Sequence, residues 1–294
     1  MTKPLGFIGL GAMGQPMAMQ LLKAGKPLVV WSRSPVSTEP FQKTDALIAD
    51  SAKHLFSECE TVILMLANSV AIDTVLGRDT KQFATLCKNH TLIQMGTTPP
   101  EYSKGLETDI LAAGGLYAEV PVSGSRGPAE KGELAAMLAG DPNTIKTIKK
   151  VIEPMTGSST YCGPVPSAMQ MKLAVNTYLS GLMNGLFEAT NFARLCGLDL
   201  EQFRGILEAS PMNNNLMRMK LPMIINEEYT PVQASVFQAV ENTRMILAAG
   251  AEVGATMLGV KNSNAIQEEA KATGLADLDF TAVYKIYKSL NKPK

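Results

Sequence analysis

The chain has 294 residues and a mass of 31.5 kDa, a length that favours two domains. Lys and Arg total 27, Asp and Glu also total 27, and no segment concentrates basic residues, which argues against a surface for nucleic acid or anionic membrane. The longest clean apolar run, 62–67, is far shorter than the roughly 20 residues that cross a bilayer. The first residues lack a signal-peptide core, so we expect a cytoplasmic protein with no nucleic-acid or membrane partner.

The first half of the chain alternates short apolar runs with helix-length amphipathic segments, which predicts a parallel sheet covered by helices. Each predicted strand is a continuous apolar run, as expected for a strand buried on both faces. The strands are predicted at 5–9, 28–31, 46–49, 61–66, 91–95, 116–119 and 133–139. The helices are predicted at 13–24, 52–59, 70–76, 101–113 and 143–153.

The second half is predicted to be helical throughout. After the turn-rich stretch 155–166 no segment reads as a strand, and helices are predicted at 167–196, 200–209, 232–249, 255–273 and 280–289. Gly197 and Gly250 are predicted helix stops, and Pro211, Pro222 and Pro231 are predicted loop residues. We therefore expect an α/β Rossmann-type, doubly wound domain at 1–165 and an all-α domain at 166–294 that begins with a long interdomain helix.

The cysteines and histidines exclude several kinds of chemistry. The cysteines form no CxxC pair, and neither histidine has a partner at helical or turn spacing, so we expect reduced thiols, no metal site and no Ser-His-Asp triad. These residues are Cys59, Cys87, Cys162, Cys196, His54 and His90.

A glycine-rich turn follows the first predicted strand and leads directly into a helix. It reads G-x-G-x-x-G, in which the first glycine permits the tight turn, the second lets the backbone approach a pyrophosphate, and the third lets the helix pack closely. The helix N-terminus offers free N–H groups to the phosphates. We expect a dinucleotide to bind here, on Gly9, Leu10, Gly11, Ala12, Met13 and Gly14.

The end of the second strand indicates which dinucleotide. Sites for NAD usually place an acid here to bind the ribose 2′-hydroxyl, whereas this chain has Ser32, Arg33 and Ser34. An arginine pairs with a 2′-phosphate that a carboxylate would repel. We therefore expect NADPH to be preferred over NADH, and we expect further cofactor contacts from Leu66, Ala67 and Thr97.

Several collinear motifs resemble the β-hydroxyacid dehydrogenase family, which includes 3-hydroxyisobutyrate dehydrogenases, tartronate semialdehyde reductases and glyoxylate/succinic semialdehyde reductases. The stretch 6–18 resembles its cofactor signature, 121–132 its substrate-binding signature, Lys172 with Asn176 its catalytic K-x-x-x-N pair, and 274–280 its tail. The Ser-Gly-Ser form at 123–125 and Arg33 are most similar to the glyoxylate/succinic semialdehyde reductase branch. The resemblance implies a fold like that of 6-phosphogluconate dehydrogenase.

The resemblance also implies a reaction, the NADP-dependent reduction of a small aldehyde or 2-oxo acid to the hydroxy acid. Lys172 would be the general acid, because developing charge on the substrate oxygen needs a proton donor. Burial can lower a lysine pKa toward the working range. Asn176, one turn later, would hold the lysine or the substrate, and Ser123, Gly124 and Ser125 would bind the substrate carboxylate.

The chain departs from the family pattern at two places. Where the family has glycines before the lysine, this chain has Pro166, Ser167 and Ala168, which predicts a stiffer hinge. Where the family has Lys-Asp in a later helix, this chain has Glu241 and Asn242, and a glutamate near a carboxylate substrate is unfavourable. Two alternatives therefore stay open: a less acidic carbonyl or an imine as the substrate, and a non-catalytic cofactor sensor or dimerisation scaffold.

Apolar residues on more than one face of the helical half predict self-association. They occur around 169–187 and again around 245–257. Helices that are apolar on two sides tend to be buried against a second copy. We expect a homodimer or homotetramer.

Overall fold

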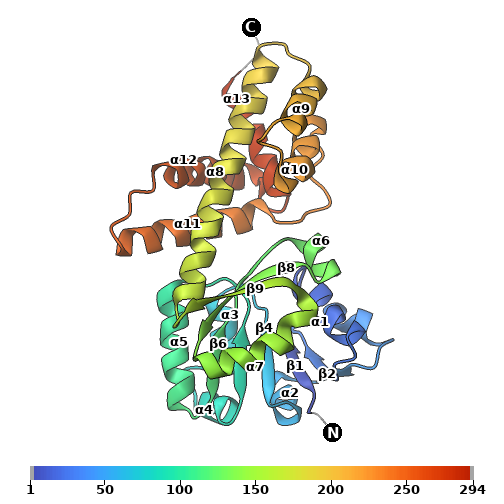
Figure 1. Cartoon of the computed structure of the whole chain (residues 1–294), viewed down its shortest axis with the longest axis vertical. Coiled ribbons are helices and arrows are strands. Elements are labelled where there is room, and N and C mark those ends of the chain that lie inside the picture. The colour runs from blue at the N-terminus through green and yellow to red at the C-terminus, as the bar shows by residue number, and fades with distance from the viewer. Residues whose placement is uncertain (1–2, 292–294) are drawn as a thin grey trace. The chain divides into compact units, whose positions relative to one another are not determined.

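The computed structural model describes residues 3–291 (Figure 1). The chain forms two compact units, of which the first ends at Lys172 and the second begins at Leu173. This division falls inside the long helix α8 (Ser167–Leu195), a few residues after the boundary that the sequence predicts at 165. None of the helices formed by residues 3–291 has both the length and the apolar character needed to span a membrane.

The first unit is built on one sheet, in which β1 lies between β2 and β4. Six parallel strands lie in the order β3-β2-β1-β4-β5-β6, which is the order of a doubly wound dinucleotide-binding sheet. They are β1 (Leu5–Ile8), β2 (Leu28–Trp31), β3 (Leu47–Ile48), β4 (Thr61–Leu64), β5 (Thr91–Gln94) and β6 (Leu116–Glu119). Beyond β6 the sheet continues with β8 (Leu134–Gly140), which runs antiparallel to β6 and β7 (Val122–Ser123) and parallel to β9 (Thr156–Gly163).

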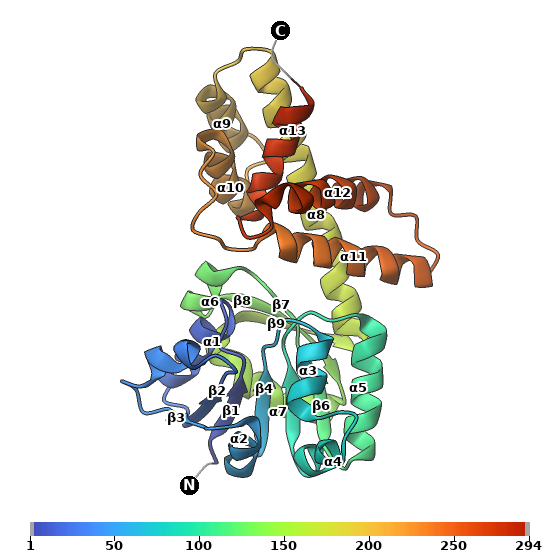
Figure 2. The ribbon, with the colours of Figure 1, turned by 180° about the vertical axis from the view of Figure 1, so that it is seen from behind.

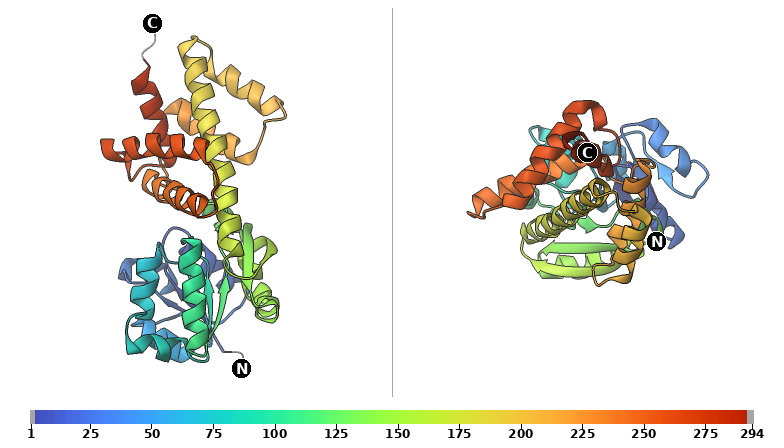
Figure 3. Two further views of the ribbon diagram at one scale, coloured as in Figure 1. Left: turned by 90° about the vertical axis from the view of Figure 1, so that its left-hand side faces the viewer. Right: turned by 90° about the horizontal axis from the view of Figure 1, so that it is seen from above.

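Helices cover both faces of this sheet (Figure 2, Figure 3). They are α1 (Gly14–Lys23), α2 (Ala52–Glu58), α3 (Ser69–Leu76), α4 (Lys81–Cys87), α5 (Pro100–Ala112), α6 (Arg126–Lys131) and α7 (Pro142–Ile152), with short 3₁₀ turns at Pro35–Phe41 and Glu153–Met155. Met17 and Leu21 of α1 and Ile148 of α7 share one core with strand residues such as Phe7 and Ile63. The apolar strand runs are buried because helices lie on both sides, which confirms the predicted fold class.

The second unit is helical, as the sequence predicts. It comprises the rest of α8 with α9 (Leu200–Ala209), α10 (Asn215–Asn226), α11 (Val236–Glu252), α12 (Leu258–Ala270), a π-helical turn at Lys271–Leu275, a 3₁₀ turn at Phe280–Val283, and α13 (Tyr284–Leu290). Phe187 of α8, Leu221 of α10, Val240 of α11 and Tyr284 of α13 meet in its core. In this part of the chain, up to residue 291, the strand-like pairing is limited to one bridge between Ser235 and Asp279.

Three sequence predictions about local structure are wrong, and three helices were not predicted. The stretch 155–166 is not only turns, because Thr156–Gly163 forms β9, an edge strand whose polar side chains are largely exposed. Pro222 lies inside α10, which the sequence analysis missed; burial of Leu221 and Ile224 stabilises this helix around the proline. Gly250 does not end its helix but lies buried inside α11, where a β-carbon would come 2.8 Å from Cγ of Met257. Helices α4 and α6 were also missed.

Candidate active site

The predicted cofactor residues follow the carboxyl ends of strands in the sheet of the first unit. The glycine turn 9–14 follows β1, residues 32–34 follow β2, Leu66 and Ala67 follow β4, and Thr97 follows β5. Because these strands are parallel, their carboxyl ends lie at the same edge, which is where open α/β sheets bind ligands. The loops approach closely there, since a β-carbon on Gly96 would overlap the carbonyl oxygen of Leu66.

The three glycines of the turn differ in what surrounds them. Gly9 has a φ of +99°, and a β-carbon there would overlap the carbonyl oxygen of Met65. A β-carbon on Gly14 would overlap the carbonyl oxygen of Gly9. A β-carbon on Gly11, by contrast, would meet no atom within 4 Å. The fold of the chain therefore requires the first and third glycines, and the second faces open space, as a backbone approached by a pyrophosphate would.

The first turn of α1 supplies N–H groups at this edge. Met13 is the N-cap residue of α1 and makes no side-chain capping bond. Within the described residues, the N–H groups of Ala12, Met13 and Gly14 have no hydrogen-bond acceptor. A helix N-terminus with free N–H groups and a positive dipole end attracts a phosphate, so this turn fits a dinucleotide.

The residues after β2 carry an unpaired positive charge. The Arg33 side chain is exposed, and among residues 3–291 no carboxylate lies within 4.0 Å of its guanidinium. Ser34 directly precedes the 3₁₀ turn Pro35–Phe41 and makes no capping bond to it, and Ser32 is half-buried. The charge of Arg33 and both hydroxyls are thus available to a phosphate.

The three residues predicted to bind the substrate carboxylate lie between β7 and α6, and the first of them belongs to β7. Ser123 is the second residue of β7 and pairs with Ala135 of β8. Gly124 turns the chain with a φ of +129°, and a β-carbon there would come 2.7 Å from Cδ2 of Leu134. Ser125 precedes α6, and its hydroxyl is buried with no hydrogen-bond partner among the described residues. An unsatisfied buried hydroxyl of this kind is free to bind a polar ligand atom.

Lys172 and Asn176 lie one turn apart on α8 and are both buried, with exposures of 8% and 6%. Burial lowers the pKa of Lys172 to about 8. Within residues 3–291 the lysine forms no ion pair, and no hydrogen bond joins it to Asn176. A lysine with a pKa near 8 can both hold a proton at neutral pH and release it to a reacting oxygen.

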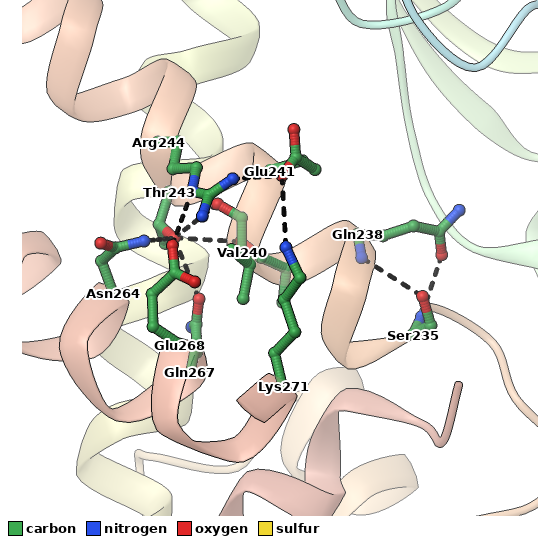
Figure 4. A network of polar contacts seen from close by, with 11 residues as sticks. Ser235, Gln238, Val240, Glu241, Thr243, Arg244, Asn264, Gln267, Glu268 and Lys271 are labelled. Atoms are coloured by element: carbon green, nitrogen blue, oxygen red, sulfur yellow. Dashed lines mark hydrogen bonds and ion pairs between the residues drawn. The ribbon is translucent and has the colours of Figure 1, made fainter. Parts of the chain in front are cut away.

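Glu241 and Asn242, which stand where the resemblance implies Lys-Asp, lie within α11. Figure 4 shows Glu241 with its charged neighbours. The Glu241 carboxylate accepts a hydrogen bond of 2.9 Å from Arg244 and lies 4.0 Å from Nζ of Lys271. Arg244 also pairs with Glu268 of α12 at 2.6 Å. The negative charge of Glu241 is therefore compensated inside the helical unit. This compensation reduces the repulsion of a carboxylate substrate that the sequence analysis expects from Glu241. The side-chain oxygen of Asn242, Oδ1, is buried and has no hydrogen-bond partner among the described residues.

The sequence analysis missed one buried acid near the start of α8. Glu119 is the last residue of β6 and is fully buried, and one of its carboxylate oxygens accepts a hydrogen bond of 2.7 Å from the Met169 N–H. Burial raises the pKa of Glu119 to about 7. A carboxylate at the end of an otherwise apolar, doubly covered strand was the signal that could have identified it.

Both halves of the chain match known family models. The model described as the NAD binding domain of 6-phosphogluconate dehydrogenase matches residues 4–163. The model described as the NAD-binding part of NADP-dependent 3-hydroxyisobutyrate dehydrogenase matches residues 167–287.

Individual proteins resemble the chain over nearly its whole length. It is 31% identical to glyoxylate/succinic semialdehyde reductase 1 of Arabidopsis thaliana, over 97% of this chain and 98% of that protein. It is 29% identical to the chloroplastic glyoxylate/succinic semialdehyde reductase 2 of the same plant, over 98% of this chain and 80% of that protein. The structure of a Mycobacterium tuberculosis 3-hydroxyisobutyrate dehydrogenase with L-serine superposes with a TM-score of 0.85 at 23% identity, covering 98% of this chain and 100% of that one, which supports the same fold.

Proposed function

The chain belongs to the β-hydroxyacid dehydrogenase family of NAD(P)-dependent oxidoreductases, and we propose that it uses NADPH to reduce a small aldehyde or 2-oxo acid. The proposed substrates are of the glyoxylate or succinic semialdehyde type, and the products are the corresponding hydroxy acids. The observation that carries this proposal is Lys172, a buried lysine with a pKa lowered to about 8. Burying an ammonium without a partner costs folding free energy. Ionisable groups with strongly shifted pKa values cluster at functional sites.

Residues of the first unit would hold the cofactor. The open space at Gly11 and the free N–H groups at the start of α1 fit a pyrophosphate. The unpaired Arg33, with Ser32 and Ser34 beside it, fits a ribose 2′-phosphate and therefore favours NADPH. Leu66, Ala67 and Thr97 lie at the same sheet edge and would line the rest of the site. When bound, the nicotinamide supplies the hydride that reduces the carbonyl carbon.

The chain's own residues would bind the substrate and move the proton. As charge develops on the carbonyl oxygen, the Lys172 ammonium would stabilise it and donate the proton. Asn176, one turn along α8, would orient the lysine or the substrate by hydrogen bonding. The hydroxyls of Ser123 and Ser125 and the backbone at Gly124 would bind the substrate carboxylate, for which the unpartnered Ser125 hydroxyl is available.

A turnover assay tests this function. NADPH consumption would be followed with glyoxylate, succinic semialdehyde, an aldehyde of similar size without a carboxylate, and a cyclic imine. We expect turnover with the two acids, strongly reduced turnover without the carboxylate, and loss of activity in Lys172→Met. Preference for the uncharged aldehyde or the imine would favour the alternative substrate class. Absence of turnover with every compound, in protein that binds NADPH, would favour the non-catalytic scaffold.

A further inference from the structure

The end of β6 contacts the start of the helix that carries Lys172. The Glu119 carboxylate accepts a hydrogen bond of 2.7 Å from the N–H of Met169, the third residue of α8. The first N–H groups of a helix have no partner within the helix, so Glu119 caps α8 from a strand 50 residues earlier in the chain. Met169 and Lys172 are three residues apart and therefore lie on neighbouring positions of one helix face.

The rest of this carboxylate is buried without a partner. Its second oxygen, Oε2, makes no hydrogen bond among the described residues. The Ser103 hydroxyl lies close enough to lower the pKa of Glu119, but it is hydrogen-bonded to the Tyr117 hydroxyl at 2.8 Å. Gln94 of β5 is the register partner of Glu119 across the parallel strand pair, and its buried side-chain amide has no partner in the same part of the chain. Burying a charge in such surroundings costs folding free energy. A neutral side chain would therefore cap the helix at a lower cost if the cap were purely structural.

We propose that Glu119 is a positioning residue whose carboxylate anchors the first turn of α8 and thereby holds Lys172 in the orientation that proton transfer needs. The inference rests on the proposed function for its catalytic consequence. The anchoring itself stands on the contact between Glu119 and Met169. Without this acceptor, the first turn of α8 would have one more unsatisfied N–H group and would fray.

The groups around Glu119 make the anchor sensitive to pH. Burial is the main cause that raises its pKa to about 7, and Glu107 of α5 adds repulsion; the Ser103 hydroxyl of α5 and the N–H groups of Met169 and Ala168 act in the opposite direction. Tyr117 of β6 and Cys162 of β9 are the other titratable neighbours, and the pKa of each is raised. Below about pH 7 the carboxyl is protonated, which weakens a hydrogen bond that is stronger with an ionised acceptor.

Two variants separate the anchor from its charge. Glu119→Gln keeps an oxygen that can accept from Met169 but cannot ionise, and Glu119→Ala removes the acceptor. Hydrogen exchange would be measured on the amides of residues 167–170, corrected for intrinsic exchange, from pH 6 to pH 9. We expect wild-type protection to fall as the pH is lowered through about 7, Glu119→Gln to show no such step, and Glu119→Ala to exchange at least about tenfold faster at pH 8.

Turnover of the same variants tests the consequence for Lys172. We expect kcat to fall between about 10- and 100-fold in Glu119→Ala, because Lys172 would be misplaced for proton transfer. The Kd for NADPH should be unchanged, since Lys172 acts on the substrate and not on the cofactor. Glu119→Gln should restore kcat to within about threefold of wild type at pH 8 and should lack the acidic limb near pH 7. A merely structural cap would alter thermal stability but not the shape of the pH profile.

Asp141→Ala is the matched control. Asp141 accepts a hydrogen bond of 2.8 Å from Thr144, at the equivalent position of α7, so its loss should loosen α7 and leave kcat and the pH profile unchanged. Wild-type exchange at 167–170 in Glu119→Ala, or an acidic limb that persists in Glu119→Gln, would overturn the proposal. Hydrogen exchange needs no substrate, so it tests the contact between Glu119 and Met169 independently of activity. If the wild-type protein showed no turnover, the proposed function would be overturned, and the exchange data would still test the anchoring.

Discussion

Gly14 packs so closely on Gly9 that a β-carbon at Gly14 would overlap the carbonyl oxygen of Gly9. The helix α1 can therefore approach the end of β1 only because residue 14 is glycine. Gly11, between them, meets nothing within 4 Å of a β-carbon. The packing of the protein therefore requires glycine at positions 9 and 14 but not at position 11.

This contrast predicts different consequences for two alanine substitutions. Gly14→Ala should lower the free energy of unfolding by about 1–3 kcal/mol, because the added methyl group overlaps backbone. Gly11→Ala should change stability by no more than about 0.5 kcal/mol but weaken NADPH binding at least tenfold, since the methyl group would occupy space meant for the pyrophosphate. Thermal unfolding without cofactor and fluorescence titration with NADPH measure the two effects. Normal NADPH affinity in Gly11→Ala would show that the cofactor does not approach this turn.

Arg33 should decide between the two nicotinamide cofactors. Arg33→Ala should cost NADPH about 1.5–3 kcal/mol of binding free energy, because one charge-assisted phosphate contact is lost, and leave NADH little changed. Both cofactors would be titrated by calorimetry, with Lys81→Ala, an exposed lysine of α4, as the control for general charge. Equal losses for NADPH and NADH would contradict the assignment of Arg33 to the 2′-phosphate.

Lys172 should control the alkaline limb of the reduction. The lysine must be protonated to donate, and its pKa is lowered to about 8 by burial, so kcat should fall as the pH rises through about 8. Lys172→Ala should lower kcat by about 10²–10⁴-fold with NADPH affinity retained. Lys172→Arg should restore little, because a guanidinium does not release its proton near neutral pH, and Asn176→Ala should be milder. Near-native kcat in Lys172→Ala would remove the lysine from the mechanism.

The tail of the helical unit depends on a buried ion pair. Nζ of Lys220 in α10 lies 2.8 Å from a carboxylate oxygen of Asp279, and both side chains are buried. Lys220→Met should lower the free energy of unfolding by about 3–5 kcal/mol, because it leaves the Asp279 charge buried and unpaired. Lys3→Met, which breaks the exposed pair with Glu60, should cost less than about 1 kcal/mol. Denaturant unfolding compares the two variants. Similar small losses would show that the other donors to Asp279, which are the N–H groups of Gln233 and Thr281 and the Thr281 hydroxyl, stabilise it without Lys220.

One face of α8 presents apolar and small residues to solvent. Tyr178 is 70% exposed and Phe192 68% exposed, and the exposed residues between them on this face include Gly181, Gly185 and Ala189. A smooth apolar helix face fits a second copy of the chain. We expect light scattering to give at least the mass of a dimer, and Phe192→Glu to shift it toward the monomer, while Leu111→Glu on α5 should not. A monomeric wild-type protein at micromolar concentration would reject self-association.

Features with a local signal were predictable from the sequence. Largely apolar runs of four to six residues identified the six parallel strands, because strands covered on both faces are mostly apolar. The spacing of Gly9, Gly11 and Gly14 after such a run predicted the tight turn and the close packing of α1, since steric overlap between neighbouring backbone atoms is set by the local chain. The single long helix after residue 166 was likewise visible in its apolar periodicity.

Features that depend on distant partners were decided only by the tertiary structure. The polar strand β9 exists because β8 offers it an edge to pair with, and Pro222 stays in a helix because its neighbours are buried in a core. The contact between Glu119 and Met169 joins residues 50 positions apart, and the lowered pKa of Lys172 arises from burial. No sequence pattern encodes these, because desolvation and hydrogen-bond partners are properties of the folded surroundings and not of the residue type.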